Sequence, residues 1–98
     1  MTIDLIRNGS DLTLAPKGRL DTVTAPELEK TLKETLEGVT ALTLDLAGLE
    51  YISSAGLRVL LSAHKRMSRQ GTMRLVHVGE IVREILEVTG FTEILTIE

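Results

Sequence analysis

The fold of this chain is decided by residues 46–61, which read LAGLEYISSAGLRVLL. An apolar strand ends in a tight turn that carries two serines, and the turn leads into an amphipathic helix. A serine hydroxyl at the first position of a helix faces unpaired backbone N–H groups and the positive end of the helix dipole. It can cap the helix or, once phosphorylated, hold a dianion there. The turn is therefore the segment in which we look for function.

Two short strands are predicted before this stretch, at residues 3–7 and 12–15. Asn8-Gly9 between them favours a tight hairpin, because this pair readily accepts positive φ angles. Pro16 cannot donate a hydrogen bond to a sheet ladder, so the second strand is expected to break or end before residue 20. The chain is therefore expected to open with an antiparallel β-hairpin.

A helix is predicted to begin at Thr24, after a loop near Asp21, because Thr24 and Glu27 have the form of a capping box. Pro26 fits the first turn of a helix, where its missing N–H costs nothing. Apolar residues then recur every three or four positions, which predicts one buried stripe that comprises Leu28, Leu32, Leu36 and Val39.

The remaining pattern predicts, in order, a strand at 41–46, a helix from Ser54 to Gly71, a strand at 73–78, a helix at 80–88 and a strand at 94–97. The apolar stripe of the last helix is expected to comprise Ile81, Ile85 and Val88. The predicted order is thus ββαβαβαβ in one domain, residues 1–98. Strands separated by helices pair in parallel through right-handed crossovers. The expected fold class is α/β, with a mixed sheet of parallel βα crossovers and an N-terminal hairpin.

The composition excludes several classes of function. The formal net charge is −3, the pI is near 5.4 and 2% of the residues are aromatic, so the chain lacks the basic face and the stacking platform of a nucleic-acid binder. Without cysteine it has no disulfide and no thiolate metal site, which fits a cytoplasmic protein. No apolar run is long enough to span a bilayer, so we expect no direct contact with a membrane.

The motifs of catalysis and of cofactor binding are missing from the sequence. Serine hydrolases place their nucleophile in a G-x-S-x-G elbow, but Ile52 stands where Ser54 would need its preceding glycine. His64 and His77 are the candidate bases, and their places on a helix stripe and in a strand favour structural roles. The chain has no phosphate-binding glycine loop and no cluster with metal-ligand spacing. We therefore expect no catalytic residue, no metal and no cofactor.

The serine turn, together with the segments around it, resembles the signature of the STAS domain, which is found in bacterial anti-sigma factor antagonists and in sulfate transporters. The resemblance spans nearly the whole chain. Its most informative parts are residues 18–21 (GRLD), 24–28 (TAPEL), 44–46 (LDL), 51–57 (YISSAGL) and 89–91 (TGF).

The resemblance also implies which residues carry the function. In the antagonists the turn typically reads Asp-Ser-Ser/Thr-Gly-Leu and its first serine is phosphorylated, which makes Ser54 the implied acceptor. Ser53 stands where those proteins have aspartate, and Ala55 where they have serine or threonine. Arg58, one helical turn after Ser54, is a candidate clamp for the phosphate. The implied partner-binding set comprises Asp21, Ser53, Ser54, Ala55, Gly56, Leu57 and Arg58.

By this resemblance the chain is expected to be a non-enzymatic anti-sigma factor antagonist. It would bind an anti-sigma factor that is also a serine kinase, release the sigma factor held there, and lose this binding when Ser54 is phosphorylated. A serine phosphatase is the second implied partner. Family members commonly carry a further helix after the last strand, so part of the docking surface is expected to be missing from this chain, which stops at Glu98.

Two other functions remain open at this stage. The first is a STAS interaction subunit of an ABC lipid transporter or a signalling assembly that works without phosphorylation. The neutral Ser53 in place of aspartate favours this alternative. The second is a small serine hydrolase that uses Ser53 or Ser54, for which no base is placed.

Overall fold

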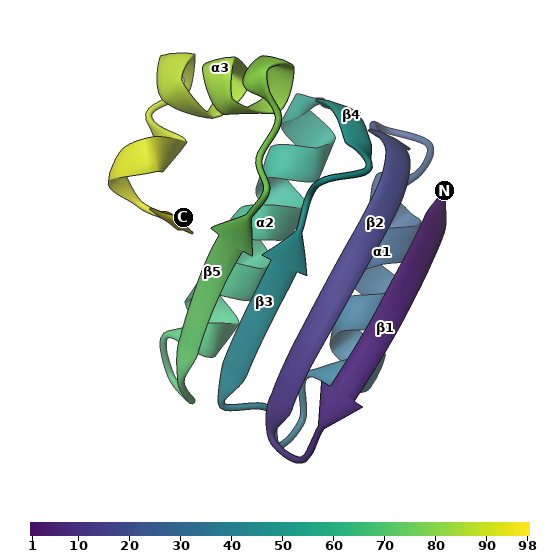
Figure 1. Cartoon of the computed structure of the whole chain (residues 1–98), viewed down its shortest axis with the longest axis vertical. Helices are drawn as coiled ribbons and strands as arrows, with labels where there is room; N and C mark the ends of the chain where they lie inside the picture. The colour runs from purple at the N-terminus through teal and green to yellow at the C-terminus, as the bar shows by residue number, and fades with distance from the viewer.

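A mixed six-stranded sheet carries two long helices on one face, and a third helix lies across the end of the sheet (Figure 1). The computed structural model describes residues 1–98, the whole chain. None of its helices combines the length and the apolar character needed to cross a membrane. The elements are β1 (Thr2–Asn8), β2 (Asp11–Leu20), α1 (Ala25–Thr35), β3 (Ala41–Asp45), β4 (Leu49–Ile52), α2 (Ser54–Met67), β5 (Thr72–Val76), α3 (Glu80–Val88), the 3-10 turn η1 (Phe91–Glu93) and β6 (Thr96–Ile97).

The predicted N-terminal hairpin is confirmed. β1 and β2 pair antiparallel, starting with Asn8 opposite Asp11. The two turn residues are Gly9 and Ser10, one position later than predicted. Gly9 takes a φ of 62°, a conformation that costs glycine little, so the tight turn closes without strain.

β2 runs through Pro16 without a break, so the prediction that this proline interrupts or ends the strand is wrong. β2 pairs with β3 only as far as Leu14 and with β4 only from Gly18. Pro16 lies between these two stretches, where no neighbouring strand needs its missing N–H, and on the other side it faces Ile3 of β1. The sheet thus accepts the proline at the point where β2 changes partner.

The strands lie in the order β1-β2-β3-β5-β6, with β4 paired to the far part of β2. Every pair except β1–β2 is parallel, and α1 and α2 cover one face of the sheet (Figure 1). The α/β class, the hairpin and the parallel crossovers are therefore confirmed. Other details differ from the prediction: β4 is an additional strand, β5 ends at Val76 and leaves His77 outside the strand, and the last strand is only Thr96–Ile97, after η1.

Aliphatic side chains from both layers form one core. The stripe predicted for the first helix is wholly buried. In α3 the prediction is wrong for Ile81 and Val88, which are 61% and 78% exposed, whereas Ile85 packs against the core. The buried residues of this helix are Val82 and Leu86. The two stripes are neighbours on this helix, and its packing against β4 decides which of them is buried.

Candidate functional site

Two loops of the predicted site leave the sheet side by side. β2 and β4 pair in parallel with Leu20 opposite Ile52, so the residues that follow, Asp21 and Ser53, emerge at the same edge. The backbone N–H of Ser53 donates a hydrogen bond to the carbonyl oxygen of Leu20 at 2.8 Å. The serine turn is therefore fixed to the end of β2.

Ser53 caps helix α2. Its backbone is extended, with φ −99° and ψ 177°, and its hydroxyl oxygen accepts a hydrogen bond from the backbone N–H of Gly56 at 3.5 Å. Its carbonyl oxygen accepts a second hydrogen bond from the N–H of Leu57 at 2.9 Å. Serine and aspartate are both preferred at this position, and a side-chain cap stabilises a helix by about 1 kcal/mol. Ser53 thus has a structural role that aspartate could also fill.

Ser54 is the first residue of α2, and its side chain is exposed to solvent. The backbone N–H groups of Ser54 and Ala55 have no acceptor within the chain. The first turn of α2 contains no acidic residue. The hydroxyl of Ser54 therefore lies beside free N–H donors at the positive end of a helix, in reach of another macromolecule.

Gly56 and Leu57 lie beneath the turn and are buried. A Cβ atom on Gly56 would lie 2.7 Å from Cγ of Leu20 and 2.8 Å from Cγ1 of Ile52, so only glycine lets α2 approach the strand ends this closely. Their inclusion in the partner-binding set stays a prediction. These two residues hold the turn in place and present almost no surface of their own.

Ala55 and Arg58 complete the α2 side of the site. Ala55 is half-buried, and Arg58 is exposed and makes no ion pair or hydrogen bond within the chain. Arg58 follows Ser54 by four residues, which places both on one face of the helix. Ala55 and Arg58, together with Thr22, border a hollow between α1 and α2.

Asp21 organises its own loop. Its Oδ1 atom accepts hydrogen bonds from the backbone N–H groups of Val23 at 3.0 Å and Thr24 at 3.2 Å. The pKa of the Asp21 carboxyl is held below its ordinary value, mainly by the hydrogen bond from the N–H of Thr24. The N–H of Val23, the Thr24 hydroxyl and the Arg19 guanidinium also lower this pKa, and burial raises it by a smaller amount. Asp21 therefore stabilises the loop in its ionised form.

The capping box predicted at Thr24 is wrong in its contacts. Thr24 occupies the N-cap position of α1, but its hydroxyl donates to the carbonyl oxygen of Arg19 at 2.7 Å and accepts from the N–H of Asp21 at 2.9 Å. The carboxylate of Glu27 lies 3.6 Å from the N-terminal ammonium of Met1. Asp21 takes the place expected for Glu27, because its Oδ1 atom accepts from the N–H of Thr24, and the N–H of Glu27 donates to the carbonyl oxygen of Thr24 at 2.9 Å.

A pair of residues beside the site was not predicted. The guanidinium of Arg19 lies 4.3 Å from the ring centroid of Tyr51, and its Nε atom lies 4.0 Å from Oδ2 of Asp21. Arg19 and Tyr51 are opposite each other in the β2–β4 register. The sequence pattern places Tyr51 in the turn and predicts no strand there, so the pairing of β4 with β2 that brings Tyr51 to Arg19 was missed.

No base is placed to activate either serine. His64 follows Ser54 by ten residues along α2, which separates them by about 15 Å along the helix axis. His77 lies at the end of β5, where its Nδ1 atom is 3.0 Å from Oδ1 of Asp45. No group of three or more metal-binding side chains comes together anywhere in the chain. The turn thus offers an accessible hydroxyl without the machinery of a nucleophile.

The sequence model of the STAS domain matches residues 2–98. The chain belongs to the STAS domain family. It is 37% identical over 83 residues to BtrV of Bordetella bronchiseptica, which is named as a candidate anti-sigma factor antagonist; the match covers 83% of this chain and 72% of the relative. The family expected from the serine turn is therefore confirmed.

Solved structures show the same STAS fold. The crystal structure of an anti-sigma factor antagonist from Mycobacterium paratuberculosis superposes with a TM-score of 0.89 at 24% identity and covers 98% of this chain and 83% of that one. The Bacillus cell fate determinant SpoIIAA in its phosphorylated form superposes with a TM-score of 0.76 at 14% identity, over 99% of this chain and 91% of that one. At these identities the likeness concerns the fold alone.

Proposed function

We propose that this STAS domain is a non-enzymatic switch that binds an anti-sigma factor with serine-kinase activity and so frees the sigma factor held there. Phosphorylation of Ser54 ends the binding. The observation that carries the proposal is the different state of the two serines: Ser53 is engaged as a helix cap, and Ser54 is exposed with free N–H groups beside it. Membership of a family whose members include anti-sigma factor antagonists supports it.

The switch is electrostatic. Unmodified Ser54 is a small neutral group against which a partner packs closely, whereas phosphoserine carries a charge of about −1.5 to −2 and a strongly held hydration shell. Docking on that charge requires its desolvation, which is costly. The helix N-terminus favours an anion by about 0.3 to 1 kcal/mol, and Arg58 lies on the same face. Phosphorylation therefore changes recognition and leaves the domain folded.

The fold supports this view. SpoIIAA, which shares the architecture, is known in a phosphorylated form, so a STAS domain can carry a phosphate and stay folded. In this chain Asp21 emerges next to the turn and adds a negative charge that a kinase would meet on approach. We assign the partner contacts to Asp21, Ser53, Ser54, Ala55 and Arg58. A serine phosphatase that restores the hydroxyl, and a cytoplasmic location, belong to the same proposal.

Phosphate transfer tests the proposal. The purified chain is incubated with ATP and the serine-kinase anti-sigma factors of the same genome, and the intact mass is measured. We expect one added phosphate on the wild type and none on Ser54→Ala, with Ser10→Ala, at an exposed serine of the β1–β2 turn, still phosphorylated as the control. Labelling that persists in a folded Ser54→Ala variant would reject Ser54 as the acceptor.

One observation favours the alternative of a STAS subunit that works without phosphorylation. Ser53 is neutral, so the acceptor lacks the carboxylate that commonly precedes it in the antagonists. Copurification separates the two functions. Recovery of a transporter ATPase or a scaffold protein with the tagged chain, together with no phosphate on Ser54, would displace the antagonist proposal.

A further inference from the structure

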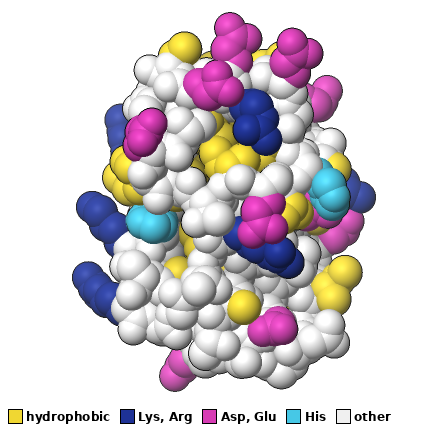
Figure 2. All heavy atoms as spheres, turned by 60° about the vertical axis from the view of Figure 1, so that its left-hand side comes forward, with side chains coloured by type: hydrophobic (Ala, Val, Ile, Leu, Met, Phe, Trp, Pro, Cys, Tyr) yellow, Lys and Arg dark blue, Asp and Glu magenta, His cyan; other side chains and the backbone are white.

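Helix α2 and the turn that follows it carry four cations that have no partner within the chain. Arg58, Lys65, Arg66 and Arg69 make no ion pair and no hydrogen bond, and the only other cation in this state is Arg83 of α3. The segment 54–69 contains no Asp or Glu, although the whole chain has a net charge of −3. Lys and Arg side chains gather along one edge of the view in Figure 2, on the side of the helix layer.

The helix dipole explains only part of this run. Lys65 and Arg66 lie in the last turn of α2, where cations stabilise a helix. Arg58 lies beyond the first turn of α2, where the dipole gives a cation no stabilisation, and Arg69 lies in the turn after the helix. Positive charge that is not neutralised within the chain attracts negative charge from a partner.

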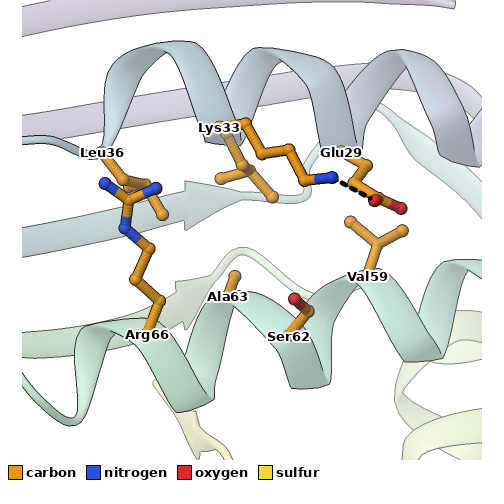
Figure 3. Close-up of a pocket in the computed structure, with 8 residues that line it drawn as sticks. Glu29, Lys33, Leu36, Val59, Ser62, Ala63 and Arg66 are labelled. Atoms are coloured by element: carbon orange, nitrogen blue, oxygen red, sulfur yellow. Dashed lines mark ion pairs between the residues drawn. The ribbon is translucent and has the colours of Figure 1, made fainter.

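An apolar groove lies between α1 and α2, and Arg66 is the one of these four cations that lines it (Figure 3). Its apolar lining is Leu32 and Leu36 of α1 and Val59 and Ala63 of α2, and its volume is about 150 Å³. A cavity of about this size can hold a benzene-sized group. The side chain of Arg66 extends from α2 over the end of the groove nearest Leu36 (Figure 3). The groove therefore has room for one apolar side chain with a cation beside it.

The groove is continuous with the serine turn. Val59 and Ser62 line both the groove and the hollow that reaches Ala55 and Arg58. On the α1 rim the carboxylate of Glu29 is paired with Nζ of Lys33 at 3.0 Å, so its charge is compensated (Figure 3). We use the term α2 face for this groove with its row of cations, Arg58, Lys65, Arg66 and Arg69.

We propose that the α2 face is the docking surface for an acidic amphipathic helix of the partner protein. Its carboxylates meet Arg58, Lys65 and Arg66, and one of its apolar side chains fills the groove. This inference rests on the proposed function and extends it, because it gives the partner's contact segment a charge and a shape. The end of the docked helix lies at Ser54, so a phosphate there repels its nearest carboxylates.

Two other anionic surfaces fit the α2 face less well. A nucleic acid would find no aromatic ring to stack on, since Tyr51 and Phe91 lie outside this face. An anionic membrane takes up apolar side chains that protrude from a helix, whereas here the apolar groups are recessed between two helices. A protein helix supplies both the acids and a protruding apolar side chain.

Charge reversal tests the inference on the full chain. Arg66→Glu and Lys65→Glu are compared with Arg83→Glu, which matches them in charge change and in the lack of an internal partner. In the transfer of phosphate from ATP to Ser54 by the anti-sigma factor kinase, we expect the KM for the chain to rise at least tenfold for Arg66→Glu, several-fold for Lys65→Glu and less than twofold for Arg83→Glu, with kcat unchanged. Thermal unfolding identifies any variant that fails to fold.

The outcomes separate this inference from the proposed function. If the wild type is phosphorylated on Ser54 and all three variants have the same KM as the wild type, the proposal that the α2 face is a docking surface is overturned and the antagonist proposal stands. If the wild type takes up no phosphate, the antagonist proposal fails. The face is then judged by titration of the isotope-labelled chain with a synthetic helical peptide of Glu and Leu. Changes in amide chemical shifts that are confined to α1 and α2, and that Arg66→Glu abolishes, would support the α2 face as a docking surface for an acidic helix. Tighter binding to duplex DNA or to phosphatidylserine vesicles than to the peptide would contradict it.

Discussion

The hydroxyl of Ser53 accepts a hydrogen bond from the N–H of Gly56, whereas the side chain of Ser54, one residue on, is exposed. The difference arises from backbone geometry alone. Ser53 has the extended conformation of an N-cap, which turns its oxygen toward the helix, and Ser54 has already entered the helix. Two chemically identical side chains thus receive different roles, and only the second is free for modification.

At the same scale, Asp21 predicts how stability depends on pH. Hydrogen bonds from Thr24 and Val23 hold the pKa of this carboxyl below its ordinary value of 3.8. Its contribution to the free energy of unfolding is therefore complete above pH 3.8 and is lost as the pH falls through the lower pKa of the folded state. We expect Asp21→Asn to lose less stability than the wild type between pH 6 and pH 3, as measured by urea unfolding.

The control for this measurement is Asp11→Asn, because the Asp11 carboxyl makes no ion pair with a cation of the chain. It should follow the wild-type profile. Equal acid sensitivity of Asp21→Asn and the wild type would contradict the role assigned to the loop.

At the scale of the element, the first turn of α2 is positioned by a close approach to the ends of β2 and β4. Gly56 makes this approach possible, because a Cβ atom there would overlap Leu20 and Ile52. Both neighbours are 1% exposed or less, so neither has room to move away. The exposure of Ser54 thus depends on a glycine that never reaches the surface.

We therefore expect Gly56→Ala to destabilise the domain. Overpacking costs about 1 to 3 kcal/mol. This outweighs the gain of about 1 kcal/mol from the better helix propensity of alanine. Urea unfolding should show a net loss of about 1 kcal/mol. Gly79→Ala, at the N-cap of α3, is the control for steric overlap alone, since nothing lies within 4 Å of a Cβ atom at Gly79. A Gly56→Ala variant as stable as the wild type would show that the turn does not need this contact.

The elements that sequence could predict are those whose pattern is local. The stripe of α1, the hairpin and the start of α2 at Ser54 each depend on spacing or turn chemistry within one segment. Three other features depend on neighbouring elements that are distant in sequence. They are the passage of β2 through Pro16, the presence of strand β4 and the buried side of α3. The capping box at Thr24 is wrong for the same reason, because Asp21 from the preceding loop accepts the hydrogen bond of the Thr24 N–H that was expected to go to Glu27.

At the scale of the whole molecule, charge is distributed unevenly. Acidic side chains gather at the end of the molecule where α3 lies, and cations follow the side of the helix layer (Figure 2). Ser54 begins α2 and Arg58 follows it by four residues, so a phosphate on Ser54 would add negative charge where the α2 face begins. The fold itself does not depend on that charge, since the core contains no polar or charged side chain.

The central claim is that one phosphate on Ser54 ends partner binding and spares the fold. The most direct measurement is calorimetric titration of the anti-sigma factor with the unmodified chain and with the chain phosphorylated on Ser54, alongside amide spectra of both forms. The account predicts that phosphorylation raises the dissociation constant at least tenfold, with spectral changes confined to residues around the turn. Equal dissociation constants for the two forms, or loss of binding through unfolding of the phosphorylated chain, would contradict it.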